Sequence, residues 1–250
     1  MNLPKISIIT IVYNNVRDIE HTLLSVINQT YSNIEYIIID GASTDGTLEI
    51  IKNYRGSIDV LISEKDKGIY DAMNKGLSLA TGDYVLFLNS GDELFDNNTI
   101  ETIVNKGNNA DIIYGETKLV DENRNIIGDR RHKAPKEFNW KSFQYGMSIC
   151  HQAIYVKREI AEPYNLNYKL SSDIDWVIRA AKKAKTTQNV NAYVARYLVG
   201  GMSQQRHKQS LKERFEIFEK HYGKIRNWIN HGIIALRLIN YRIKHGKTRE

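Results

Sequence analysis

The stretch Ile37-Ile-Ile-Asp-Gly-Ala-Ser-Thr-Asp-Gly-Thr47 joins an apolar run to a turn that carries two carboxylates. A second stretch of the same design, Tyr84-Val-Leu-Phe-Leu-Asn-Ser-Gly-Asp92, follows later in the chain. Both apolar runs are typical of buried parallel strands. Because ligands of open α/β sheets bind beyond the carboxyl ends of the strands, the two stretches predict a polyphosphate-like ligand held there with a divalent cation.

Predicted strands and helices alternate around these stretches. Apolar runs indicate strands at 5–12, 34–39, 60–63, 84–89 and 111–114, and helical spacing indicates helices at 18–29, 47–54, 69–80 and 98–106. Farther along we expect a hairpin at 117–130, strands at 151–156 and 191–199, and helices at 172–183, 205–222 and 225–244. This order is typical of a doubly wound α/β fold, a mostly parallel sheet with flanking helices, followed by a helical appendage.

Length and composition limit the possible classes of protein. The chain has 250 residues, which suffices for one large α/β domain at 1–204 and a small C-terminal part at 205–250. Its one cysteine, Cys150, excludes an internal disulfide framework and a cysteine-rich metal site, and it fits a reducing cytoplasm. The apolar run 6–12 is too short to span a membrane and is interpreted as a strand.

The segment from residue 224 onward is basic and amphipathic. Apolar residues recur at helical spacing from Ile225 to Ile243, and the only acid is Glu250. Such a helix lies in an anionic membrane interface, or it packs on the rest of the chain or on a second subunit of a homo-oligomer. The segment is too charged to span a membrane. No recognised nucleic-acid-binding fold is present, so we expect no nucleic acid partner.

Each acidic stretch has a functional and a structural interpretation. Asp40 can accept hydrogen bonds from a nucleobase or a ribose hydroxyl, or it can cap the turn with Ser43 and Thr44. Asp92 can bind a hard cation such as Mg²⁺, which takes carboxylate and phosphate oxygens, or it can close a turn.

The helix expected at 172–183 has acidic residues on two faces. Asp175 and Arg179 stand at i, i+4 spacing and predict a structural ion pair. Asp173 lies on another face with Trp176, where it is either a helix cap or a chemical group.

Five runs, taken together, resemble the family 2 glycosyltransferases of the GT-A fold. They are Thr10-Ile-Val-Tyr-Asn-Asn15, Ser25-Val-Ile-Asn-Gln-Thr-Tyr31, Ile34-Glu-Tyr-Ile-Ile-Ile-Asp-Gly-Ala-Ser-Thr-Asp-Gly-Thr47, Gly68-Ile-Tyr-Asp-Ala-Met-Asn-Lys-Gly76 and Ala80-Thr-Gly-Asp-Tyr-Val-Leu-Phe-Leu-Asn-Ser-Gly-Asp92. Their order and spacing match throughout 5–95, and the resemblance continues more loosely to about Ser203. It is closest to the bacterial subgroup that builds colanic-acid-like, capsular and O-antigen polysaccharides.

The resemblance implies an inverting transfer of a sugar from a nucleotide diphosphate to a hydroxyl. The implied partners are a nucleotide-sugar donor and a glycan or lipid-linked saccharide acceptor, with Mg²⁺ or Mn²⁺ as cofactor. Together with Cys150 and the basic C-terminal segment, this activity fits a location in the cytoplasm, with the inner face of the plasma membrane as the place of a membrane-bound form. The alternative is a catalytically silent protein that binds a nucleotide sugar as a scaffold.

The resemblance also assigns donor-binding residues. Asp40 matches the acid that contacts the base of the nucleotide, and Thr10 and Tyr13 match the strand end that borders the base and ribose. Asp66 lies at the second nucleotide-contacting loop.

The run that begins at Asn89 and Ser90 matches the metal station of the family, with a departure. The usual run is Asp-x-Asp-Asp, and here Asn89 and Gly91 replace two of its carboxylates. Asp92 keeps its acid and is the expected metal ligand.

The later part of the chain matches the acceptor side of the family. Asp173 matches the general base, which accepts the proton of the attacking hydroxyl. His151 and Gln152 match a His-Gln pair that contacts the diphosphate or the acceptor. Gly201 and Ser203 lie in a loop that resembles the late Gly-Gly-x-Ser loop, whose N–H groups cradle the leaving diphosphate.

Overall fold

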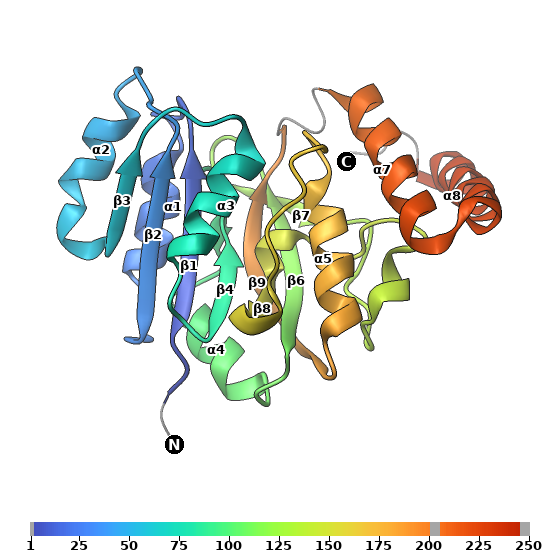
Figure 1. The fold of residues 1–250 in the computed structure, drawn as a ribbon, viewed down its shortest axis with the longest axis horizontal. Helices are drawn as coiled ribbons and strands as arrows, with labels where there is room; N and C mark the ends of the chain where they lie inside the picture. The colour runs from blue at the N-terminus through green and yellow to red at the C-terminus, as the bar shows by residue number, and fades with distance from the viewer. Residues whose placement is uncertain (1–2, 201–205, 246–250) are drawn as a thin grey trace.

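The computed structural model of the protein describes residues 3–200 and 206–245. A mixed nine-stranded sheet forms its centre, in the order β3-β2-β1-β4-β8-β6-β9-β5 with β7 paired to β6 (Figure 1). The strands are β1 Ile6–Val12, β2 Ile34–Asp40, β3 Val60–Ser63, β4 Tyr84–Phe87, β5 Glu93–Leu94, β6 Ile112–Val120, β7 Ile126–Asp129, β8 Ile154–Lys157 and β9 Thr187–Leu198. The predicted α/β class is confirmed.

Helices cover the sheet, with α3 and α5 in front of it and α1 behind it in the view of Figure 1. The α-helices are α1 Ile19–Ile27, α2 Thr47–Asn53, α3 Ile69–Leu79, α4 Thr99–Lys106, α5 Ser172–Lys183, α7 His207–Tyr222 and α8 Lys224–His245. Short 3₁₀ turns are η1 Arg55–Ser57, η2 Trp140–Phe143, η3 His151–Ala153 and η4 Arg158–Ile160. These helices agree with those expected from the spacing of apolar residues.

The first half of the sheet is parallel. β1 pairs with β2 and β4, and β2 pairs with β3, all in the parallel sense, so their carboxyl ends lie at one edge. Every residue of β1 is buried, as expected for a central strand covered on both faces. Gly76 allows α3 to approach closely, because a Cβ atom there would lie 2.4 Å from Cγ2 of Ile9.

The second half mixes strand directions. β8 runs antiparallel between β4 and β6, and β9 runs parallel to β6. The start of β8 and the end of β9 therefore lie at the same edge as the carboxyl ends of β1, β2 and β4. The two-residue strand β5, antiparallel to β9, was not predicted, since two residues are too few to show a period.

The last two helices differ in how they meet the rest of the chain. α7 contacts α5, and α8 contacts α7 (Figure 1). The boundary expected near residue 204 falls in 201–205, outside the described residues. Within the described ranges, no helix combines the length and apolar character needed to cross a membrane.

Candidate active site

Asp40 ends β2 and its side chain is completely buried. Its carboxylate accepts hydrogen bonds from the backbone N–H of Ser43 at 3.1 Å and from the hydroxyls of Ser43 and Ser63 at 2.5 and 2.6 Å. The structure thus has the turn-capping contact with Ser43, and it adds Ser63 from the end of β3. Thr44 instead donates its backbone N–H to Asn14. The role of Asp40 at the nucleotide base stays a prediction.

Two of the other donor-side residues flank the turn after β2. Gly41 lies between Tyr13 and Asp66, because a Cβ atom built on it would stand 3.2 Å from the Tyr13 ring and 3.1 Å from Asp66 Oδ2. Tyr13 is 67% exposed, so its ring is available to a ligand. Asp66 is paired with Lys75 on α3, with 2.6 Å between Oδ1 and Nζ. Thr10 is completely buried, and its hydroxyl lies 3.2 Å from that of Tyr36.

Asn89 and Ser90 follow β4 at the shared edge. Nδ2 of Asn89 lies 3.1 Å from Nε2 of His151. Oδ1 of Asn89 is buried and has no hydrogen-bond partner among the described residues. The Ser90 hydroxyl accepts a hydrogen bond of 2.9 Å from the Asn15 side chain. An unpartnered buried oxygen costs stability, which is typical of a group that meets a ligand.

Asp92 is 5% exposed and is held by two neighbours. Gln152 donates to its Oδ2 at 2.5 Å, and the backbone N–H of Leu198 donates to its Oδ1 at 3.0 Å. Burial raises the pKa of Asp92 to about 6, against the opposing effect of these hydrogen bonds. A carboxylate has about four lone-pair sites, so each oxygen can still accept one more contact. Gly91, with φ +101°, forms the turn that places this carboxylate.

Asp173 stands in the first turn of α5. Its Oδ2 lies 3.4 Å from Nδ1 of His151, and its Oδ1 accepts a hydrogen bond of 3.2 Å from the Tyr70 hydroxyl. Burial by itself raises the pKa of Asp173, but the contact with His151, the charge of Arg214 and the hydrogen bond from Tyr70 together outweigh burial, so that the pKa lies below its ordinary value. Asp173 is therefore an ionised carboxylate with its two oxygens oriented, as a general base requires.

One tautomer of His151 satisfies both of its neighbours. If Nδ1 carries the proton, it donates to Asp173, and Nε2 accepts from Nδ2 of Asn89. Asn89 Oδ1 is then left free at the strand end. His151 thus joins the residue after β4 to the proposed base on α5. The expected strand at 151–156 begins later, at Ile154, because residues 151–153 form the turn η3 that directs His151 and Gln152 to Asp173 and Asp92.

Two residues that support the site were not predicted. Tyr70, which contacts Asp173, lies inside the quoted run 68–76, but the sequence does not show that its hydroxyl reaches another helix. Arg124, in the turn after β6, donates to the carbonyl of Gly91 at 2.6 Å and pairs with Glu93 and Asp18. No local pattern marks Arg124, because its partners lie far away in sequence. Gly201 and Ser203 lie outside the described residues.

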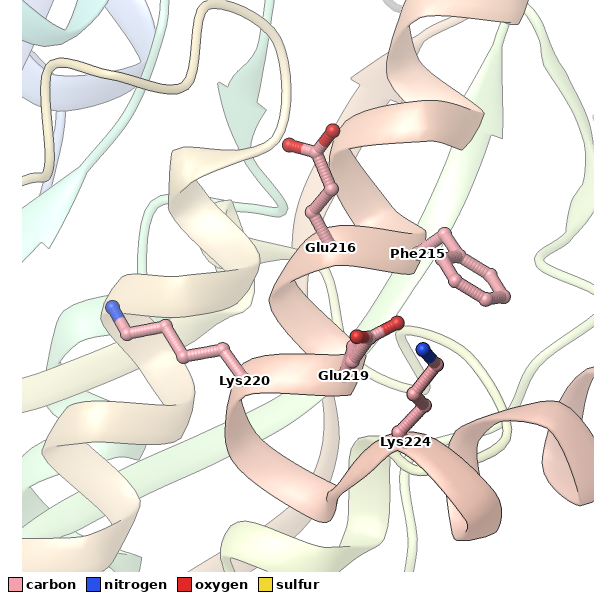
Figure 2. Close-up of a pocket in the computed structure, with 5 residues that line it drawn as sticks. All are labelled: Phe215, Glu216, Glu219, Lys220 and Lys224. Carbon is pink, nitrogen blue, oxygen red and sulfur yellow. The ribbon is translucent and has the colours of Figure 1, made fainter.

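Two surface hollows lie apart from these residues. One, of about 580 Å³, is lined by side chains of α7 and the first residue of α8, as Figure 2 shows: Phe215, Glu216, Glu219, Lys220 and Lys224. The other lies beside α1 and β5. No residue assigned to the site from the sequence lines either hollow, so the site is defined by its side-chain contacts.

Comparisons with known proteins identify the family of the chain. The model of the family described as "Glycosyl transferase family 2" matches residues 7–162. A "PGL/p-HBAD biosynthesis glycosyltransferase" of Mycobacterium bovis (strain BCG / Pasteur 1173P2) is 31% identical over 214 residues, which cover 81% of this chain and 80% of the relative.

Solved structures show the same architecture. S. aureus TarS in complex with UDP-GlcNAc has a TM-score of 0.69 at 18% identity, covering 95% of this chain and 72% of that one. The mannosyltransferase PcManGT from Pyrobaculum calidifontis, in complex with GDP-Man and Mn²⁺, has a TM-score of 0.67 at 16% identity, covering 96% and 72%. With the expected GT-A fold and a family match over more than half of its length, the chain is a glycosyltransferase that belongs to glycosyltransferase family 2.

Proposed function

We propose that this glycosyltransferase moves a sugar, with inversion, from a nucleotide-diphosphate sugar to a hydroxyl of a glycan acceptor in the assembly of a bacterial surface polysaccharide. The observation that carries the proposal is the position of Asp173. It is held as an ionised carboxylate by His151 and Tyr70, at the sheet edge where Asn89 and Asp92 also lie.

In this proposal Asp173 is the general base. An inverting transfer needs a carboxylate that takes the proton of the acceptor hydroxyl as that oxygen attacks the anomeric carbon. His151 orients the carboxylate from one side and Tyr70 from the other, with contacts of 3.4 and 3.2 Å. Such fixed geometry lowers the barrier because the reacting groups need not be ordered during the reaction.

The donor site is proposed on the other half of the shared edge. Tyr13 offers an exposed ring for the base, and Asp66 stands across Gly41 from it. Asp40 caps this turn, and Thr10 is buried in β1 opposite Ile38 of β2. TarS and PcManGT were solved with UDP-GlcNAc and GDP-Man, and we propose a nucleotide sugar of this class as the donor here.

We propose that a divalent cation, Mg²⁺ or Mn²⁺, is held by oxygen atoms of two protein side chains together with phosphate oxygens of the sugar nucleotide. Among the described residues, no three acidic, histidine or cysteine side chains are grouped around a metal position. Mg²⁺, however, usually takes one or two protein ligands together with substrate phosphates. Asn89, through its unpartnered Oδ1, and Asp92, through its remaining lone pairs, would supply these ligands. The cation would neutralise charge on the leaving diphosphate.

The acceptor is proposed to be lipid-linked, and the protein to act at the inner face of the plasma membrane. The outward face of α8 is apolar and exposed: Ile225 79%, Trp228 62%, Ile229 59%, Leu236 68%, Ile239 55% and Ile243 79%. Basic residues flank this face in the sequence. An amphipathic basic helix binds an anionic interface through buried apolar area and charge. The alternative to a membrane surface is that a second copy of the chain covers this face.

Vesicle binding separates the two occupants. Leu236→Glu should release the protein from vesicles that contain anionic lipid. Leu211→Glu, the same substitution at a leucine of α7 that is 48% exposed, should leave binding nearly unchanged. If Leu236→Glu instead turns a dimer into a monomer and leaves vesicle binding intact, α8 is a subunit contact.

The proposed activity is tested by thermal shift followed by a hydrolysis assay. UDP-sugars and GDP-sugars with Mn²⁺ should raise the melting temperature, since a ligand at 100 times its dissociation constant adds about 2.7 kcal/mol of stability. The stabilising sugar nucleotide should be hydrolysed slowly by the wild type and not by Asp173→Asn. A protein that binds the donor but shows no turnover with any acceptor would be the catalytically silent scaffold.

A further inference from the structure

α7 is fixed against the segment that leads into α5. Glu213 is 7% exposed, and its carboxylate accepts hydrogen bonds from the backbone N–H groups of Lys169, Leu170 and Ser171 at 2.8 to 3.1 Å. The hydroxyl of Ser210 lies 3.2 Å from that of Ser171. The first half of α7 is therefore held beside the start of α5, two residues from Asp173.

Arg214 lies on the side of α7 that faces the rest of the protein. Ser210 stands four residues before it, and Ile217 and Phe218 stand three and four residues after it, and all three are buried. On a helix, this spacing defines one face. Arg214 is accordingly partly buried, and its Nε atom is shielded from solvent.

Within the described ranges, this guanidinium has no hydrogen-bond or ion-pair partner. Its Nε is buried without a hydrogen bond, and no ion pair or hydrogen bond joins Arg214 to any residue in the described part of the chain. Arginine is seldom buried without a partner, because an unpaired buried donor costs stability and an unpaired charge costs more. The neighbouring Glu213 does not compensate it, since its oxygens are taken by the backbone of 169–171. Such a group is typical of a binding site for an anion.

The charge of Arg214 reaches the proposed base. After burial, which raises the pKa of Asp173, and the contact with His151, which lowers it, Arg214 is a further group that lowers it. No ion pair among the described residues joins Arg214 directly to Asp173, so the guanidinium is not neutralised by contact with the proposed base.

We propose that Arg214 binds a phosphate group, and that this phosphate belongs to the acceptor. The inference rests on the proposed sugar transfer. A planar guanidinium offers paired N–H donors that match phosphate oxygens. In an inverting displacement, the attacking hydroxyl and the leaving phosphate lie on opposite sides of the anomeric carbon. A cation beside the base therefore lies on the acceptor side. The acceptor class that fits is a saccharide linked to a lipid through phosphate or diphosphate.

Binding measurements test the proposal with Arg214→Gln and a matched control. Lys212→Gln removes a positive charge from the same helix, at a side chain that is 80% exposed. Titrations follow tryptophan fluorescence with farnesyl diphosphate as the acceptor probe, in the presence of saturating UDP or GDP. UDP and GDP are also compared with UMP and GMP. We expect Arg214→Gln to weaken farnesyl diphosphate binding about tenfold or more, and Lys212→Gln to change it less than about twofold.

The outcomes separate the two sources of phosphate. If Arg214→Gln weakens binding of the diphosphates UDP and GDP but not of the monophosphates, Arg214 binds phosphate from the donor, and the assignment to the acceptor is overturned. If the variant binds every probe as the wild type does, the phosphate site itself is overturned. A wild type that binds farnesyl diphosphate but neither UDP nor GDP would contradict the proposed donor and leave the Arg214 site standing.

A stability measurement excludes a purely structural role. Because Nε of this partly buried guanidinium has no hydrogen-bond partner, Arg214→Leu should raise the midpoint of urea unfolding while it abolishes the binding of farnesyl diphosphate. A structural role predicts the opposite shift of the midpoint. Arg214→Lys, which keeps the charge but loses the paired donors, should retain part of the binding.

Discussion

Nδ1 of His151 lies 3.4 Å from Oδ2 of Asp173, so the residue that begins η3 is in contact with the first turn of α5. The other ring nitrogen of His151 lies 3.1 Å from Asn89, just after β4. One imidazole thus connects the proposed base to the strand end where the donor diphosphate is expected. The following predictions depend on this connection and on the way α7 is held beside it.

Replacement of the base removes the chemistry and leaves the fold intact. Asp173→Asn keeps the shape of the side chain but cannot accept a proton, so we expect the rate of sugar transfer to fall roughly 10²- to 10⁴-fold. Donor binding should be unchanged. Initial rates and the dissociation constant of the donor are the measurements. Glu122→Gln, at a side chain that is 71% exposed, is the control, and equal losses in both variants would contradict the assignment.

Loss of His151 should move the pH dependence of transfer. His151 lowers the pKa of Asp173, so in His151→Ala the pKa of Asp173 rises and the base is protonated at a higher pH than in the wild type. The acid limb of kcat against pH should shift to higher pH. A lower kcat with the acid limb in its wild-type position would mean that His151 acts only by orienting Asp173.

Glu213 anchors α7, and its removal should destabilise the protein. Glu213→Ala leaves the N–H groups of Leu170 and Ser171 without their acceptor, and we expect a loss of about 3 kcal/mol in the free energy of unfolding. Urea denaturation measures it. Glu216→Gln, an acid on the same helix that is 51% exposed, should lie within about 0.5 kcal/mol of the wild type. If Glu213→Ala also lowers the free energy of unfolding by no more than about 0.5 kcal/mol, α7 is held by its apolar contacts alone.

Asp175 joins α5 to α7. From its contacts we expect the protein to lose stability in acid. Asp175 is completely buried and accepts from Arg179 and His221 at 2.8 Å and from Lys220 at 3.2 Å. Burial raises its pKa, but these hydrogen bonds and the positive charge of Arg179 together outweigh burial and bring the pKa of Asp175 well below its ordinary value. Its stabilising contribution is therefore complete above pH about 4 and is lost as the pH falls further toward the lowered pKa.

The difference in unfolding free energy between wild type and Asp175→Asn should accordingly narrow below pH about 4. Urea denaturation at a series of pH values measures it. Glu49→Gln, at an exposed side chain on α2, should show no such narrowing. If the difference in unfolding free energy between wild type and Asp175→Asn stays constant down to the lowest pH measured, the lowered pKa of Asp175 is contradicted.

Local patterns predicted most of the elements because each pattern is complete within a few residues. The apolar runs of β1 and β2, the helical spacing of α3 and the Asp175–Arg179 pair are all of this kind. The strand expected at 151–156 was displaced, since its first residues form a turn whose side chains are held by Asp173 and Asp92 on distant elements. A single sequence contains no signal for such long-range contacts.

The sequence by itself determined the α/β class, the edge of the sheet where a ligand is expected and the membership in glycosyltransferase family 2, because periodicity and motif spacing are local properties of the chain. Only the tertiary structure decided which side chains meet there. It joined Asn89, His151 and Asp173, and it held α7, which carries Arg214, beside the start of α5. The physical reason is that hydrogen bonds, burial and charge depend on distances in space, and these are set when the sheet and its covering helices pack together.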